Sequence, residues 1–219
     1  MHRSLVATNR RALLATGIVL AMLLTIARGH AATAYHSEVR TLSGLRLDIS
    51  TPIVDEDLVD GLEIDTAIAA EILSHHRRPF APASPWKLGA AFGLFSTFQT
   101  AEAGDQDIFY SGNTLRAHLG LVYEFGDSAR IELMPYVGIG LGWLDLDTAQ
   151  LAIREPGLIT EVGATLGAFV NLGRIDIGAG AAYTSWRSRN KFRHADDSLI
   201  EIEVEQGYPS AFVSVGYRF

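Results

Sequence analysis

The chain has 219 residues, a formal net charge of −7 and no cysteine, which excludes disulfides, thiolate nucleophiles and Cys-type zinc sites. Hydrophobic residues make up 48% of the sequence, yet beyond the N-terminal segment no apolar run approaches the roughly 18 residues of a transmembrane helix. The hydrophobicity is therefore dispersed along the chain, as it would be in alternating strands.

The first 34 residues have the organisation of an export signal. A basic start that includes Arg10 and Arg11 precedes an apolar stretch from Ala12 to Ala27, and Ala32-Thr33-Ala34 fits a cleavage site. We predict a signal peptide over 1–34, cut near Ala34, and a barrel domain over 35–219. A cut after Ala31 and an uncleaved inner-membrane anchor are the alternatives. Removing four arginines leaves 14 basic and 25 acidic residues, a balance that speaks against a nucleic-acid partner.

Beyond the signal, the sequence divides into eight segments that alternate with a period of two. One set of alternate positions is apolar and carries no charge, as with Leu45, Leu47 and Ile49, and the opposite set holds the charges. Each segment is near, or somewhat longer than, the ~9–11 residues of a tilted transmembrane strand. The predicted strands are 38–50, 61–74, 86–101, 115–125, 130–146, 158–172, 174–187 and 208–219.

Most glycines fall on the charge-bearing face, as Gly138, Gly140 and Gly142 do. Glycine gains nothing on a solvent face, but it makes space inside a narrow barrel whose lumen is filled by side chains. We therefore predict an all-β fold, a closed eight-stranded antiparallel up-and-down transmembrane β-barrel with paired charges inside. The predicted lumen charge network is Arg46, Glu63, Asp65, Arg116, His118, Glu124, Arg130, Glu132, Glu161, Asp176 and Arg218, with Asp48, Glu71, Lys87 and Arg174 on the same face.

Short connections at 126–129 and 171–174 are typical of periplasmic turns, and the longer polar segments are then extracellular loops. The Pro-rich segment from His75 to Pro85 is an unusually long connection on the short side. An amphipathic helix over Asp57 to Ser74 is the alternative to a strand there.

Aromatic residues are predicted at both ends of the apolar face, where rings favour the headgroup layers. The periplasmic girdle is Trp86, Tyr123, Phe125, Tyr217 and Phe219, and the extracellular girdle is Phe98, Trp143 and Tyr183.

The stretches Ala211 to Phe219 and Pro135 to Trp143 resemble, respectively, the C-terminal insertion signal and a central strand of the small OmpA/OmpX-type bacterial outer-membrane β-barrel family. The resemblance implies a Gram-negative outer-membrane location, insertion by the outer-membrane assembly machinery, and roles as adhesins, serum-resistance factors or structural barrels. Because the chain stops at Phe219, we expect no peptidoglycan-binding domain of the kind that larger members carry.

We expect a monomer with a structural or cell-surface role in the cell envelope, exerted through extracellular loops, and no cofactor, metal site or enzymatic activity. Nucleophilic catalysis on lipid would need a serine with a histidine in reach. Ser96 and Ser185 are predicted to face outward, but no strand histidine is, and His194 falls in a loop. A lipid A-modifying enzyme and a narrow ion-conducting pore are the alternatives, the pore being opposed by lumen filling.

A basic cluster falls at the rim of the last long loop. Guanidinium groups suit phosphates, so we expect this cluster to contact lipopolysaccharide. It consists of Arg187, Arg189, Lys191 and Arg193.

Overall fold

The computed structural model describes residues 42–53, 63–81, 83–103, 106–146, 151–153, 156–194 and 199–219. In these ranges no helix has the length and apolarity to cross a membrane. The predicted signal peptide lies outside them and stays a prediction. The described strands are β1 (Leu42–Pro52), β2 (Glu63–Pro79), β3 (Trp86–Ala103), β4 (Gln106–Phe125), β5 (Ala129–Leu146), β6 (Leu151–Ile153), β7 (Gly157–Leu172), β8 (Ile175–His194) and β9 (Leu199–Arg218).

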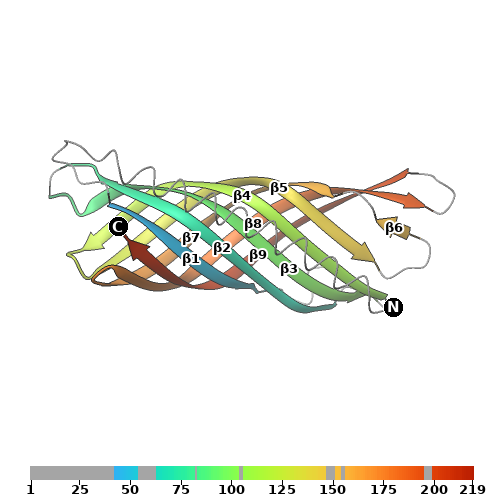
Figure 1. The fold of residues 1–219 in the computed structure, drawn as a ribbon, viewed down its shortest axis with the longest axis horizontal. Helices are drawn as coiled ribbons and strands as arrows, with labels where there is room; N and C mark the ends of the chain where they lie inside the picture. Colours follow the sequence, from blue (N-terminus) through green and yellow to red (C-terminus); the bar gives the residue numbers. More distant parts are fainter. Residues whose placement is uncertain are drawn as a thin grey trace. The chain divides into compact units, whose positions relative to one another are not determined.

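Eight long strands form a closed antiparallel ring (Figure 1). Each pairs with the next long strand along the chain, and β1 pairs with β9 from Gly44↔Arg218 to Pro52↔Ser210, which closes the ring. The three-residue strand β6 is an addition that pairs with the end of β8. The predicted eight-stranded up-and-down barrel is therefore confirmed.

Alternation along each strand sorts the side chains between the lumen and the outer surface. In β5, Met134 and Tyr136 are buried, whereas Leu133 and Val137 are 47% and 60% exposed. Strand β7 follows the same pattern through most of its length. The exposed positions are those predicted to be apolar, because successive side chains of a strand point to opposite faces.

Three short connections lie at one end of the barrel, together with the start of β1 and the end of β9 (Figure 1). Gly126 and Gly173 have positive φ values of 61° and 67°, which glycine adopts at little cost, so both turns depend on it. We call this the turn end and the opposite one the hairpin end.

The connection at the turn end between β2 and β3 is shorter than predicted. Strand β2 continues to Pro79, pairing Arg77 with Leu42 of β1 and with Gly89 of β3. The sequence HHRRP is typical of a loop because it is basic and ends in proline, but His75 and Arg77 are buried in the lumen, where Arg77 pairs with Glu124. The alternative of an amphipathic helix over Asp57 to Ser74 is wrong from Glu63 onward, where the chain is a strand, and residues 57–62 lie outside the described ones.

Two segments predicted as extracellular loops are strands instead. β3 reaches Ala103 and β4 starts at Gln106, so residues 102–114 belong to a long hairpin. In the same way β8 reaches His194 and β9 starts at Leu199. Their polarity suggests loops, but a polar segment can still form a strand when its backbone groups pair across the hairpin.

A register shift between Ile64 and Thr66 breaks the strict alternation near the hairpin end of β2. Such an irregularity moves the following residues to the opposite face. Glu63 pairs with Glu102, but the side chains of both residues lie outside the described ones, so the place of Glu63 in the lumen network stays a prediction. Asp65 lies at the irregularity itself and has no paired position.

Candidate functional site: the filled lumen and the two rims

Ion pairs connect most of the barrel strands across the lumen near the turn end. Arg46 of β1 binds Glu132 of β5 with an N–O distance of 2.6 Å and Asp48 at 2.9 Å. Arg130 shares Glu132 and also binds Asp176 of β8 at 2.9 Å. Because Glu132 and Asp176 each pair with more than one guanidinium, the strands are linked into one network rather than into isolated pairs.

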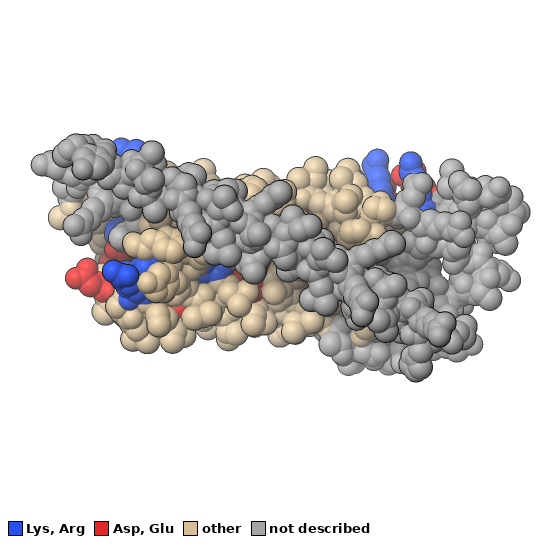
Figure 2. Space-filling model, viewed as in Figure 1, with Lys and Arg blue, Asp and Glu red and all other residues tan. Residues whose placement is uncertain are grey.

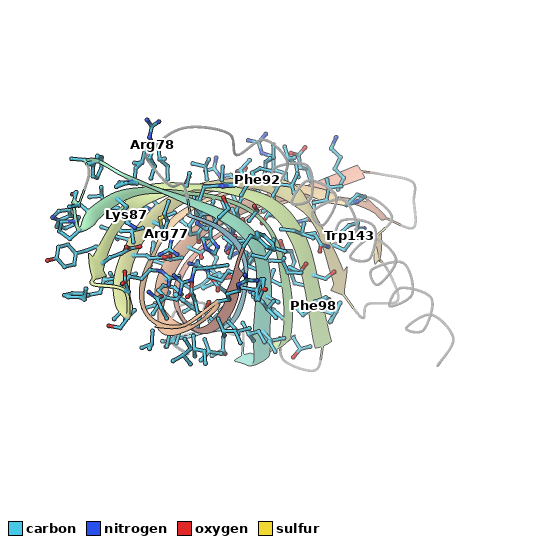
Figure 3. All side chains as sticks on the ribbon, turned by 60° about the vertical axis from the view of Figure 1, so that its left-hand side comes forward. Arg77, Arg78, Lys87, Phe92, Phe98 and Trp143 are labelled. Atoms are coloured by element: carbon cyan, nitrogen blue, oxygen red, sulfur yellow. The ribbon has the colours of Figure 1, made fainter. Side chains whose placement is uncertain are left out.

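The network continues around the rim of the turn end. Arg77 of β2 lies 3.0 Å from Glu124 of β4, whose other oxygen binds Lys87 of β3 at 2.6 Å. Asp176 also accepts Arg218 of β9 at 3.0 Å. Figure 3 shows Arg77 and Lys87 near this end of the barrel.

A second cluster is centred on Arg116 of β4. Its Nε and Nη2 atoms bind both oxygens of Glu161 at 2.7 and 2.8 Å, and Nη1 binds Glu71 at 3.1 Å. Glu71 also contacts His118 Nε2 at 2.7 Å. The guanidinium carbon lies 3.3 Å from the ring centre of Phe95, within cation–π range.

The described lumen charges balance. The basic side chains are Arg46, Arg77, Lys87, Arg116, Arg130 and Arg218, and the acidic ones are Asp48, Glu71, Glu124, Glu132, Glu161 and Asp176. With both lumen histidines counted as neutral, six formal positive charges meet six negative ones. Buried charges are tolerated when they are paired in this way.

Aromatic rings fill the lumen toward the hairpin end. Tyr110 and Trp186 stack with ring centres 4.9 Å apart, and Ile159 and Tyr208 complete a buried cluster with them. Two cavities lie in the described lumen, with volumes of about 20 and 10 Å³. A water molecule needs ~10–15 Å³ of such space, so each of these two cavities is about the size of a single water molecule.

The predicted girdle residues lie on the outer surface at the two ends. At the turn end, Trp86 packs edge-on against Tyr123 and Tyr123 against Phe125, both with ring centres 4.8 Å apart, and Tyr217 packs against Phe219 at 5.8 Å. At the hairpin end, Phe98, Trp143 and Tyr183 are exposed, together with Phe109, which the sequence pattern places in a loop. Figure 3 shows Phe98 and Trp143 toward this end. In Figure 2, most of the visible described surface between the two ends is uncharged.

The hairpin end carries an exposed charge ladder on β8 and β9. Arg187 binds Glu203 at 2.8 Å and Glu205 at 2.7 Å, and Arg189 lies 3.7 Å from Glu203. The hydrogen bond to Glu205 and the charge of Glu203 raise the pKa of Arg187 above its usual value. Lys191 is exposed in the same row, and the side chain of Arg193 lies outside the described ones. The predicted basic cluster is thus interleaved with glutamates.

Arg174 does not belong to the lumen. It occupies the turn between β7 and β8, is exposed, and donates to the Tyr217 hydroxyl at 3.3 Å, which raises the pKa of Arg174. The sequence predicts Arg174 as the first residue of a strand, but that strand begins one residue later, at Ile175. His75 and Arg77 are the lumen residues that the prediction misses, and their alternation with Glu71 and Leu73 is the signal that the sequence offers.

One histidine faces outward from a strand, contrary to prediction. His76 lies on β2 between the lumen residues His75 and Arg77, and its Nδ1 atom is 2.9 Å from the Oγ atom of Ser43 on β1. The prediction misses it because residues 75–85 resemble a connection. Among the described residues, no group of three histidine or acidic side chains is arranged to hold a metal ion.

No protein-family model and no curated protein matches the chain. Among solved structures, it is similar to the attachment invasion locus protein Ail of Yersinia pestis in complex with sucrose octasulfate, with 15% identity over 84% of this chain and 100% of that chain and a TM-score of 0.44. It is also similar to the outer membrane protein OprG of Pseudomonas aeruginosa, with 13% identity over 82% of this chain and 95% of that chain and a TM-score of 0.47. A major outer membrane protein of Thermus thermophilus shares 12% identity with it over 81% of this chain and 99% of that chain, with a TM-score of 0.47.

Proposed function

We propose that this chain is a monomeric integral outer-membrane β-barrel with a filled lumen, and that its role in the envelope of a Gram-negative cell is structural or adhesive. The observation that carries the proposal is an exposed, uncharged apolar band around a closed ring whose charges all lie inside or at the ends. The role is then exerted by the strands and loops at the hairpin end.

The height of the apolar band fits a bilayer. Outward residues of β5 from Ile131 to Leu141 span ten residue steps, which at ~3.4 Å per step and a tilt near 40° give roughly 26 Å along the barrel axis. Barrels of the bacterial outer membrane have an apolar band of about 25 Å. A closed ring also leaves no strand edge unpaired in lipid, which an open sheet would do.

The filled lumen supports a role outside the lumen. Paired charges occupy the turn half and stacked rings the hairpin half, so an ion would have to displace side chains that already fill the lumen. This packing is unfavourable to the pore alternative. The strands continue beyond the outward aromatic residues at the hairpin end and present polar surface there.

We propose that phosphates of lipopolysaccharide bind the basic residues of the β8–β9 hairpin in competition with Glu203 and Glu205. Replacing Arg187, Arg189, Lys191 and Arg193 together by Gln should reduce the lipopolysaccharide that co-purifies with the protein. Glu203→Gln with Glu205→Gln is the matched control, since it frees the same arginines and should increase it. Equal amounts of co-purified lipopolysaccharide in the wild type and in both variants would contradict the proposal.

The membrane placement is tested by cell fractionation combined with gel mobility. The full-length chain, expressed in a Gram-negative host, should enter the outer-membrane fraction and migrate differently before and after boiling, because a folded barrel resists detergent. Depleting the host's outer-membrane assembly machinery should abolish the folded band. A soluble periplasmic protein with unchanged mobility would contradict the proposal.

A further inference from the structure

We propose that Ser43 and His76 form a nucleophile–base pair on the outer surface of the barrel, which hydrolyses an acyl ester of glycerophospholipid in the periplasmic leaflet. The inference rests on the membrane placement proposed above and adds an activity to it. It starts from the Oγ–Nδ1 distance of 2.9 Å, which is within the reach that activation of a serine requires.

Both side chains belong to the outer face. On β1 the lumen positions are Gly44, Arg46 and Asp48, so Ser43 shares the outward parity of Leu45. On β2 the lumen positions include His75 and Arg77, so His76 shares the outward parity of Ile72. The two residues are direct partners in the β1–β2 register, and both are partly exposed.

The pair lies at the depth where lipid esters are found. The backbone N–H of Phe219, a member of the girdle at the turn end, donates to the Ser43 carbonyl at 3.1 Å, which places Ser43 beside the girdle. Aromatic girdles mark the layer between hydrocarbon and headgroup. Ala90 of β3, a residue with a small side chain, is the register partner of His76 on its other side.

Arg78 supplies a site for the phosphate. It is exposed, and Figure 3 shows it pointing away from the barrel, whereas Arg77 lies inside. It follows His76 by two residues on the same face, ~7 Å further toward the turn end. In a phospholipid the phosphate lies farther from the bilayer centre than the ester, so the order Arg78, then His76 and Ser43, matches the order of the lipid groups. A guanidinium is suited to phosphate.

The reaction is a two-step acyl transfer. His76 takes the Ser43 hydroxyl proton at Nδ1 while Oγ bonds to the ester carbonyl carbon, and the same proton then passes to the glycerol oxygen as the ester C–O bond breaks. Lysophospholipid leaves and an acyl-serine remains. Water, deprotonated by His76, attacks this acyl-serine and releases the fatty acid, which restores Ser43. The sum is ester plus water giving acid plus alcohol.

The test uses the mature chain, folded in detergent and checked by its heat-modifiable mobility, in mixed micelles with phosphatidylethanolamine. The wild type should release lysophospholipid and fatty acid, measured by mass spectrometry. Ser43→Ala and His76→Gln should each lower the rate at least about 100-fold, because a general base contributes that much or more. Arg78→Gln should raise KM more than it lowers kcat.

The control is Ser96→Ala, because Ser96 is also a lipid-facing serine but is bonded to Asn113 instead of a histidine, with an O–O distance of 2.7 Å. It should keep the wild-type rate. A fluorophosphonate should label Ser43 in the wild type and in the Ser96 variant, and not in Ser43→Ala. A folded wild type without ester cleavage, equal rates in the Ser43 and Ser96 variants, or release of acyl chains from lipid A instead of phospholipid would overturn the proposal. Because folding is scored separately by mobility, failure of the barrel and failure of the dyad give different results.

Discussion

Arg116 illustrates how a charge is accommodated inside this barrel. Both oxygens of Glu161 bind it, Glu71 binds its remaining Nη atom, and Phe95 covers one face of the guanidinium. Bidentate pairing fixes direction as well as distance. The arrangement therefore joins β4 to β7 and to β2 at defined positions.

Removing one partner from this cluster should be costly. Glu161→Ala leaves the buried Arg116 with Glu71 alone, and breaking a buried pair costs roughly 3–5 kcal/mol. We expect a loss of that size in the free energy of unfolding, measured by urea titration in lipid vesicles. Glu205→Gln, in an exposed pair of the β8–β9 hairpin, is the control and should change nothing measurable. A Glu161 variant as stable as the wild type would show that the ion pairs do not hold the barrel.

Gly120 is required by packing rather than by backbone conformation. A Cβ atom there would collide with the carbonyl oxygen of Leu133 on the neighbouring strand. Because a backbone atom in a paired strand cannot move freely, Gly120→Ala should destabilise the barrel by about 1–3 kcal/mol. Gly216→Ala is the comparison, since its Cβ would meet its nearest neighbour, Leu45 O, at 3.3 Å. Equal unfolding free energies for the two variants would contradict the packing argument.

At the scale of the strand, the sequence predicts best within the apolar band of the outer surface. In β5 and β7 the outward positions are apolar through most of the strand, and both strands begin within one residue of the prediction. Beyond the apolar band the contrast between the two faces of a strand disappears, because the outward positions there are polar as well. Strand and loop then have the same composition, which is why the sequence pattern places 106–114 and 199–207 in loops.

The missed residues of β2 have a related cause. His75 and Arg77 are lumen residues whose partners lie on distant strands, such as Glu124 of β4. No local signal shows that a basic, Pro-ended segment will find those partners. The register shift at Ile64 is similarly invisible in the sequence, because it depends on pairing with β3.

A depth profile along β7 tests the placement of the strands directly. The chain has no native cysteine, so Leu158, Val162, Leu166 and Leu172 can each be replaced by Cys and spin-labelled. Oxygen dissolves preferentially in the bilayer centre, so its accessibility should peak at Leu166 or Val162 and fall at both ends. Thr165→Cys, at a buried lumen position, should resist labelling in the folded protein. A flat profile would exclude a membrane-spanning β7.

For the whole molecule, the sequence predicts the closed ring and the balance of charges but not their partners. The sequence shows which charged residues face inward. Because buried charges must pair, the sequence also predicts that these residues form a network of ion pairs. Which carboxylate meets which guanidinium depends on how eight tilted strands register with one another. The stacking of Tyr110 on Trp186 depends on the same register, because it joins β4 to β8 across the lumen.

A lumen closed by paired charges and stacked rings should not conduct ions. The direct measurement is single-channel recording of the purified, folded chain in planar bilayers, at neutral pH and high salt. We predict a current that stays at the baseline of the protein-free membrane. Reproducible conductance steps, present in the wild type and absent from heat-denatured protein, would contradict the filled lumen and return the search for function to the barrel interior.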